Sequence, residues 1–151
     1  MQPTHATGSN PRIVSPAEIG ALVRRTRKAL GLTQAQVAGY SGFSERFLVE
    51  FENGRTTGSM SRIHALLLQL NIQILVGDQP LRQVAPAIRQ ARKALKFTQV
   101  DCAGFLGMGL STLKAIEKGH EGVSLLNLFR ASEGLGLHWR VVDTKNRQQD
   151  R

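Results

Sequence analysis

Residues 25–54, RTRKALGLTQAQVAGYSGFSERFLVEFENG, return 65 positions later as QARKALKFTQVDCAGFLGMGLSTLKAIEKG, residues 90–119. Counted from residue 24 to residue 54, 13 of 31 positions are identical in the second copy. The register continues without an insertion as far as Asp78 and Asp143. Self-similarity at a fixed spacing indicates that one structural unit occurs twice in the chain.

Each copy carries start signals for a series of short helices. In the first copy we expect helices after Ser15, Thr33, Ser44 and Ser59, because a serine or threonine at the N-cap accepts hydrogen bonds from free backbone N–H groups. A glutamate or glutamine three residues after Ser15 and Thr33 would complete a capping box at each. The third helix is predicted from Glu45 to about Glu52.

After the fourth helix of each copy the apolar period changes from 3.6 to 2, which predicts a strand over 72–76 and another over 137–142. A lone strand would leave its backbone groups unpaired, so we expect these two strands to pair antiparallel and to join the copies. Pro86 falls inside the region that matches the first helix, and this helix is therefore predicted to begin near Pro86 or to kink there.

The pattern T-Q-x-x-x-A-G-x-x-G, followed by an apolar third helix that ends in E-x-G, resembles the phage-repressor/Xre (Cro-like) helix-turn-helix family. The residues that carry it are Thr33, Gln34, Ala38, Gly42, Leu48, Glu52 and Gly54, and Thr98, Gln99, Ala103, Gly107, Leu113, Glu117 and Gly119. The ending LQLNIQILVGD, with its counterpart EGLGLHWRVVD, resembles the HipB-like branch of that family. That branch includes stand-alone repressors and antitoxins that bind HipA-like kinases.

The resemblance implies an all-α chain of two tandem lambda-repressor-like helix-turn-helix domains, each ending in a short β-strand, with the strands paired as a pseudo-dimer. The expected domains are 15–78 and 83–143, joined by a linker at 79–82. Residues 1–14 are expected to form a disordered arm and residues 144–151 a disordered basic tail.

The same resemblance implies an ion pair between the first and third helix of each copy. Arg27 and Glu52 occupy the matching positions in the first copy, and Arg92 and Glu117 occupy them in the second. We expect these four residues to be structural, because a largely buried pair is costly to break on one side.

Charge points to a polyanion as the partner. The formal net charge is +9 and the isoelectric point is near 10.8, which favours double-stranded DNA over a membrane surface. No apolar run approaches the ~20 residues that span a bilayer, and the N-terminus lacks the order of a signal peptide, so a cytoplasmic, nucleoid-associated protein is expected. The single cysteine excludes an internal disulfide, and no metal-ligand spacing, cofactor motif or catalytic set is evident.

The residues expected to contact bases lie at the start of the third helix and one turn later. In the first copy these are Ser44, Glu45, Arg46 and Glu50, of which Arg46 suits guanine O6 and N7 and the glutamates suit a cytosine amino group. In the second copy only Ser111 offers a polar group at a matching position, although Leu110 suits contact with a thymine methyl.

Phosphate contacts are expected from polar and basic residues around the second and third helices. They are Thr33, Gln34 and Arg55 in the first copy, and Lys96, Thr98, Gln99, Lys114 and Lys118 in the second. The first copy would therefore contact bases while the second mainly binds phosphates, and the operator would be asymmetric. A competing interpretation is that the second copy has lost DNA binding and uses its Leu110 face on a protein.

These features predict a non-enzymatic, sequence-specific DNA-binding transcriptional regulator, acting as a repressor or autoregulator and needing no cofactor. One alternative is a HipB-like antitoxin that binds a HipA-like kinase toxin and autoregulates its operon. Another is a protein-interaction module, such as an antiactivator, that kept the fold and lost DNA binding. Oligomeric state stays open between a pseudo-dimer within one chain and further homodimerisation.

Overall fold

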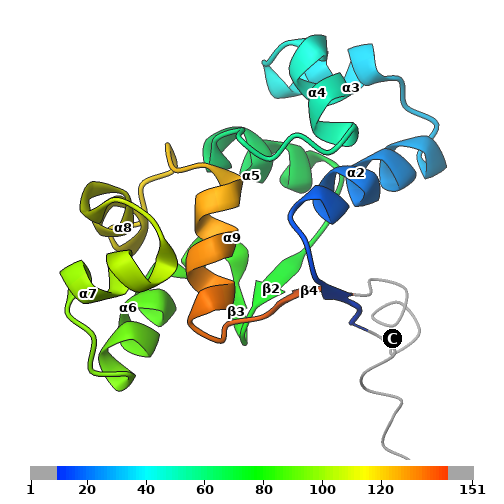
Figure 1. Ribbon diagram of the computed structural model, residues 1–151. Helices are drawn as coiled ribbons and strands as arrows, with labels where there is room; N and C mark the ends of the chain where they lie inside the picture. The colour runs from blue at the N-terminus through cyan, green and yellow to red at the C-terminus, as the bar shows by residue number, and fades with distance from the viewer. Residues whose placement is uncertain (1–9, 143–151) are drawn as a thin grey trace, which may run out of the picture.

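The computed structural model describes residues 10–142, so the predicted tail at 144–151 and most of the predicted arm lie outside the described residues. The first copy folds as helices α2 (Ala17–Ala29), α3 (Gln34–Ser41), α4 (Glu45–Glu52) and α5 (Met60–Gln69), followed by strand β2 (Ile74–Val76) (Figure 1). The second copy repeats this order with α6 (Ala85–Ala94), α7 (Gln99–Leu106), α8 (Leu110–Glu117), α9 (Leu125–Gly134) and β4 (Trp139–Val141).

The helix starts follow the predicted caps in most places. Thr33 accepts from the backbone N–H of Gln36 and forms the complete capping box, and Ser44 accepts from the N–H of Phe47. The predictions at Ser15 and Ser59 were wrong in part. Helix α2 begins at Ala17 and no side chain caps it, and α5 begins after Ser59 without a side-chain cap bond. At Ser15 only the carboxylate half of the box forms: Glu18 Oε2 accepts from the backbone N–H of Ser15 at 3.0 Å.

Pro86 lies in the first turn of α6, and it sets where the helix begins and does not kink it. A proline is tolerated there because the first N–H groups of a helix have no intrahelical acceptor. As a result α6 has 10 residues where α2 has 13.

The sheet is larger than predicted. It has four strands in the order β1-β4-β2-β3, where β1 is Arg12–Ile13 and β3 is Gln79–Pro80. The prediction of disorder for 1–14 is therefore wrong at Arg12–Ile13, and half of the predicted linker 79–82 is a strand. The physical reason is that β4 and β2 would otherwise each expose an unpaired edge, and pairing also places Ile13 in the core at 4% exposure.

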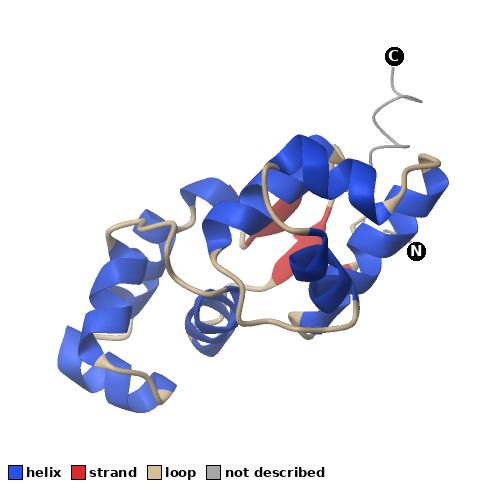
Figure 2. Cartoon of the chain, turned by 90° about the horizontal axis from the view of Figure 1, so that it is seen from above, coloured by secondary structure: helices blue, strands red, loops and turns tan. Residues whose placement is uncertain are grey.

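The pairing of β2 with β4 is symmetric between the two copies. The strands are antiparallel, with Ile74 opposite Val141, Leu75 opposite Arg140 and Val76 opposite Trp139. Because Ile74 and Trp139 share one repeat position, and Val76 and Val141 another, exchanging the copies maps this register onto itself. Seen from above in Figure 2, the strands lie near the middle of the molecule and are partly covered by helices.

A second set of contacts between the copies is also symmetric between them. Ser59 and Ser124, which share one repeat position, form an isolated antiparallel bridge. Around it, the first backbone N–H groups of each fourth helix donate to carbonyls of the other copy, which satisfies groups that a helix start leaves unpaired. The bonds are Met60 N to Val123 O at 2.8 Å and Ser61 N to Glu121 O at 2.9 Å, with Leu125 N to Gly58 O at 2.9 Å and Leu126 N to Thr56 O at 3.0 Å in return.

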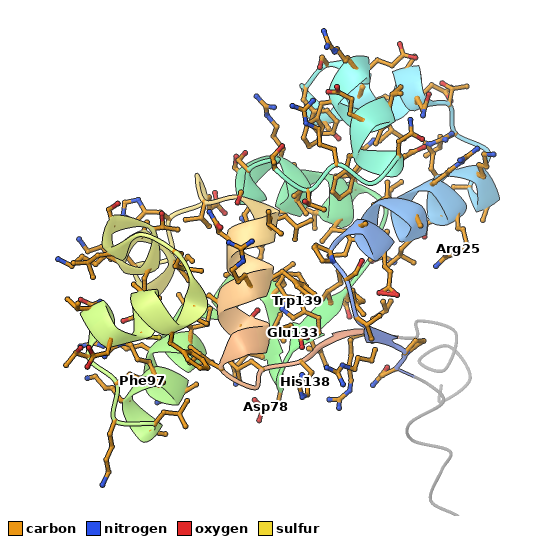
Figure 3. The ribbon with its side chains drawn as sticks, viewed as in Figure 1. Arg25, Asp78, Phe97, Glu133, His138 and Trp139 are labelled. Carbon is orange, nitrogen blue, oxygen red and sulfur yellow. The ribbon has the colours of Figure 1, made fainter. Side chains whose placement is uncertain are left out.

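Trp139 is the largest fully buried side chain and lies on β4, the strand of the second copy that pairs with β2 of the first (Figure 3). Its ring centroid is 5.0 Å from that of Phe129, and its indole N–H donates to Ser132 Oγ at 2.6 Å. Its neighbour His138 points outward, as alternation requires, with its Nδ1 3.0 Å from Glu133 Oε1. Cys102 is buried in the core, and burial raises the pKa of its thiol.

Gly20 marks a close approach of two helices. A Cβ atom at Gly20 would lie 2.0 Å from the backbone oxygen of Phe51, so α2 and α4 would have to separate. We expect Gly20→Ala to lower the free energy of unfolding by ~1–3 kcal/mol, measured by urea denaturation. Gly39→Ala in α3 is the control, because nothing lies within 4 Å of its Cβ position and alanine favours a helix. Equal stability of the two variants would contradict the close approach.

His64 on α5 predicts a pH dependence of stability. Burial, and secondly the charge of Arg82, hold its pKa below the ordinary 6.5, and Glu121 opposes them. The unfolded chain therefore binds this proton more readily, so stability is lost as pH falls through 6.5 toward the lowered pKa. Between about pH 7.5 and about pH 5, wild type should lose more free energy of unfolding than His64→Gln. Identical pH profiles for the two proteins would refute this.

Within residues 10–142, no helix combines the length and apolar character needed to cross a membrane.

Candidate nucleic-acid interface

The second and third helices of the two copies lie at far ends of the molecule. Figure 1 places α3 and α4 at one end and α7 and α8 at the other, with α5 and α9 between them. In each pair a glycine in the left-handed conformation, Gly42 at φ 77° and Gly107 at φ 69°, ends the second helix so that the third can follow at an angle. This is the helix-turn-helix arrangement, in which the third helix is the one that enters a DNA major groove.

A buried ion pair fixes α4 against α2. Arg27 donates through Nε to Glu52 Oε2 at 2.7 Å and through Nη2 to Glu52 Oε1 at 2.8 Å, with the two side chains 8% and 2% exposed. The hydrogen bond to Glu52 raises the pKa of Arg27, and Arg27 Nη1 also donates to the carbonyl of Leu32 at 2.9 Å. The pair thus holds the end of α4, the end of α2 and the entry to α3 together.

The second copy repeats this pair. Arg92 donates to Glu117 Oε2 at 2.6 Å and Oε1 at 3.0 Å, and to the carbonyl of Phe97 at 2.8 Å. The hydrogen bond to Glu117 raises the pKa of Arg92. The ion pair that supports the third helix is therefore the same in both copies.

The first residues of α3 and α7 lie against these pairs. Gln34 Nε2 donates to Glu52 Oε1 at 3.1 Å, and Gln99 Nε2 donates to Glu117 Oε1 at 3.2 Å. An amide nitrogen carries two N–H groups, so one of them stays available for a phosphate oxygen. Thr98, like Thr33, accepts from a backbone N–H at its helix start and keeps its hydroxyl hydrogen as a donor.

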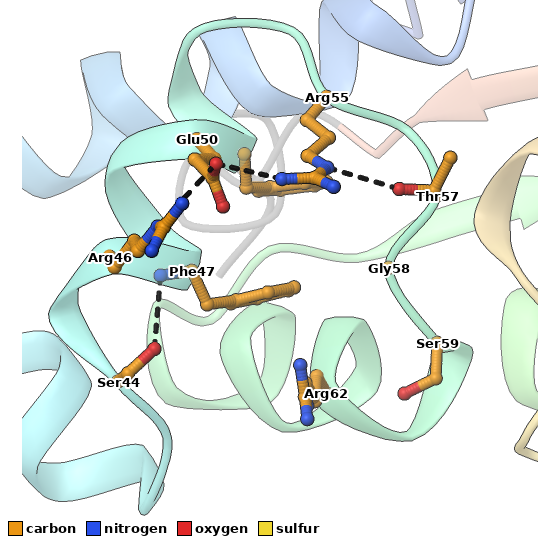
Figure 4. A pocket seen from close by; sticks show the side chains of 10 residues that line it. Ser44, Arg46, Phe47, Glu50, Arg55, Thr57, Gly58, Ser59 and Arg62 are labelled. Carbon is orange, nitrogen blue, oxygen red and sulfur yellow. Dashed lines mark hydrogen bonds and ion pairs between the residues drawn. The ribbon is translucent and has the colours of Figure 1, made fainter.

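The start of α4 presents the polar residues that the sequence predicts as base contacts. Ser44, Glu45 and Arg46 are exposed, and the Arg46 side chain is 85% exposed. Glu50, one turn later, accepts from Arg55 Nη1 at 2.7 Å and lies 3.8 Å from Arg46 Nε, so its carboxylate sits between two guanidinium groups (Figure 4).

An open hollow extends from this face to the start of α5, and one of its lining residues was not predicted from the sequence. The hollow has a volume of about 370 Å³ and includes Arg62, whose guanidinium lies 5.2 Å above the centroid of the Phe47 ring. Such a contact is a cation–π interaction and keeps a third arginine beside α4. The available signal was a basic residue in the first turn of the fourth helix, close to the third helix in the chain.

The second copy has the matching hollow with a different lining. All of its lining residues occupy repeat positions that also line the first hollow, and each hollow adjoins the Ser59–Ser124 bridge. Where the first copy has Arg46, Glu50, Arg55 and Arg62, the second has Ser111, Ala115, His120 and Asn127. Ser111 is exposed and Leu110 is half-buried.

Basic residues of the second copy gather elsewhere. Lys114, Lys118 and Arg89 line one pocket with Gln99 at the start of α7, above the Arg92–Glu117 pair. Arg89 was not among the predicted phosphate contacts, and Lys96 is exposed in the α6–α7 loop and does not line this pocket. The positions in the first copy that match Lys114 and Lys118 hold Val49 and Asn53.

The fold and these surfaces define a protein with two DNA-binding helix-turn-helix domains. Residues 18–68 match a family model described as a helix-turn-helix domain, and residues 88–142 match a second model described as helix-turn-helix. The chain is also 41% identical over 63 residues to the uncharacterized HTH-type transcriptional regulator y4mF of Sinorhizobium fredii (strain NBRC 101917 / NGR234), an alignment that covers 42% of this chain and 83% of that protein. No solved structure matches the chain significantly.

The chain therefore belongs to the helix-turn-helix family of transcriptional regulators. This membership confirms the prediction from the sequence that the protein is a DNA-binding regulator.

Proposed function

We propose that one chain binds one operator as a single-chain pseudo-dimer, with α4 and α8 entering neighbouring major-groove segments. Two sets of contacts between the copies support this most directly: the β2–β4 pairing and the Ser59–Ser124 bridge. Both stay the same when each residue is replaced by its counterpart in the other copy. Helix-turn-helix dimers bind two half-sites because their two units are related by a two-fold axis. Here a covalent link supplies both units in one molecule.

The proposal assigns unequal roles to the two units. The first contacts bases through the start of α4, where Arg46 can donate to guanine O6 and N7. The second holds phosphates through Lys114, Lys118 and Gln99, and offers bases only Ser111 and the methyl groups of Leu110. The support is the contrast between the two hollows, one carrying three arginines and the other none.

Repression or autoregulation is the mode of action we propose. Occupation of an operator by the two units is enough to exclude other proteins from that DNA. With a net charge of +9, binding should depend strongly on phosphate contacts and weaken steeply as salt concentration rises.

Selection of binding sites from a random DNA pool, followed by sequencing, tests this function. We expect an asymmetric site with one well-specified half and one loose half. Arg46→Ala should cost ~1–3 kcal/mol of binding free energy and relax preference at one position of the specified half.

Ser111→Ala, at the matching repeat position of the second copy, is the control and should change preference far less. Equal base preference in both halves would contradict the unequal roles. No enrichment above salt-sensitive background would contradict sequence-specific binding, and it would favour the interpretation of an antitoxin or interaction module with a protein partner.

A further inference from the structure

We propose that Arg55 is a positioning residue for base recognition, which holds Glu50 so that Glu50 orients Arg46 toward its base. This inference rests on the proposed DNA-binding function. It replaces two expectations from the sequence, namely that Arg55 contacts phosphate and that Glu50 itself accepts from a base.

The geometry links the three residues through one oxygen atom. Glu50 Oε2 accepts from Arg55 Nη1 at 2.7 Å and lies 3.8 Å from Arg46 Nε (Figure 4). Arg55 Nε donates in addition to Thr57 Oγ1 at 3.2 Å, so two separate nitrogens of Arg55 are engaged within the protein. The carboxylate faces the Nε side of Arg46, which leaves the two terminal nitrogens of Arg46 for the paired acceptors of guanine.

Charge explains why a glutamate is tolerated on a DNA-facing helix. A lone carboxylate beside phosphates is repelled, whereas Glu50 between two guanidinium groups belongs to a set with net positive charge. Arg55 thus neutralises Glu50 and allows it to remain beside Arg46 when DNA is close.

The contact with Glu50 can preorganise the Arg46 side chain for binding to a base. The side chain of Arg46 is 85% exposed, and on its own it would lose rotamer freedom on binding a base. A carboxylate fixed by Arg55 restricts that freedom before DNA arrives. Arg55 therefore acts on base preference through Glu50 and not through a contact of its own.

The second copy is an internal comparison. It keeps the buried Arg92–Glu117 pair that the fold requires, but at the positions of Arg46, Glu50 and Arg55 it has Ser111, Ala115 and His120. The fold is thus formed without the three charged residues, so their arrangement in the first copy is open to a role in recognition.

A double-mutant cycle tests the proposal in the full-length chain. Arg55→Ala, Glu50→Ala and the double variant are compared for affinity to the selected site and to the same site with the Arg46-dependent base pair replaced. A guanine contact by arginine gives roughly 5- to 150-fold discrimination, and we expect each single variant to reduce that discrimination roughly threefold. The double variant should lose no more than Glu50→Ala alone.

The result that would overturn the proposal is a phosphate-type response. Arg55→Ala would then weaken binding to all sequences equally, reduce the salt slope by about one and add to the effect of Glu50→Ala. His120→Ala, at the repeat position of Arg55, is the matched control and should leave base preference unchanged. If Arg46→Ala itself leaves base preference unchanged, the proposed function fails before this inference is reached, so the two failures are distinguishable.

Transfer of the set to the second copy gives an independent test. The variant Ser111→Arg/Ala115→Glu/His120→Arg is expected to select an inverted repeat in place of the asymmetric site, provided that its thermal unfolding shows a folded protein. A folded variant that still selects the asymmetric wild-type site would overturn the proposal that these three residues determine specificity.

Discussion

Replacement of Glu52 by alanine is expected to lower the free energy of unfolding by ~3–5 kcal/mol. The substitution leaves the Arg27 guanidinium 8% exposed without its carboxylate partner, and it also removes the acceptor of Gln34. Three helix ends that meet at this pair would be loosened together. Urea denaturation followed by far-UV circular dichroism and by the fluorescence of Trp139, the single tryptophan, measures the change.

Two variants show whether burial is the cause. Glu50→Ala breaks the ion pairs of a carboxylate that is 34% exposed with Arg46 and Arg55, and an exposed pair contributes only ~0–1 kcal/mol. Glu117→Ala removes the matching carboxylate of the second copy and should cost about as much as Glu52→Ala. A loss below ~1 kcal/mol for both buried glutamates would contradict the structural role of these pairs.

Trp139→Ala should destabilise the protein by ~3–5 kcal/mol, because it removes the largest buried side chain from the strand that joins the copies. The cavity would open beside Phe129, and the hydroxyl of Ser132 would lose the indole N–H that it accepts. Since β4 pairs with both β1 and β2, the first domain should lose stability with the second. Urea denaturation followed by circular dichroism measures this loss.

Arg140→Ala is the control on the same strand, since Arg140 is exposed and should change stability by less than ~0.5 kcal/mol. Trp139→Phe keeps much of the volume and loses the indole hydrogen bond, so its effect should fall between the two. A loss for Trp139→Ala no greater than that for Arg140→Ala would mean that the sheet does not couple the copies.

Local signals in the sequence were sufficient for the helices and for the central strand pair. Thr33 and Ser44 cap the helices that they were predicted to cap, and Pro86 begins a helix because of its own geometry. The pairing of β2 with β4 followed from the alternation of apolar residues in two strands that had no other predicted partner.

The edge strands could not be predicted in the same way. Arg12–Ile13 and Gln79–Pro80 are too short to show alternation, and each forms a strand only because β4 or β2 offers an unpaired edge. That edge exists only after residues far apart in the chain have come together, so no local sequence pattern predicts it.

In the candidate site, too, some features could be predicted from the sequence and others could not. The exposure of Arg46 follows from its place on the third helix, opposite the buried Leu48 and Phe51. The bond from Arg55 to Glu50 depends on the path of a loop, and the position of Arg62 above Phe47 depends on how α5 packs against α4. The sequence places Arg62 near the third helix, but residue spacing does not specify either contact.

Hydroxyl-radical footprinting of the selected operator, at one chain per duplex, tests the single-chain pseudo-dimer most directly. We expect one chain to protect two segments centred about 34–36 Å apart along one face of the DNA, the spacing of neighbouring major-groove half-sites. Protection of a single segment, or two-segment protection that appears only when two chains are bound per duplex, would contradict the account.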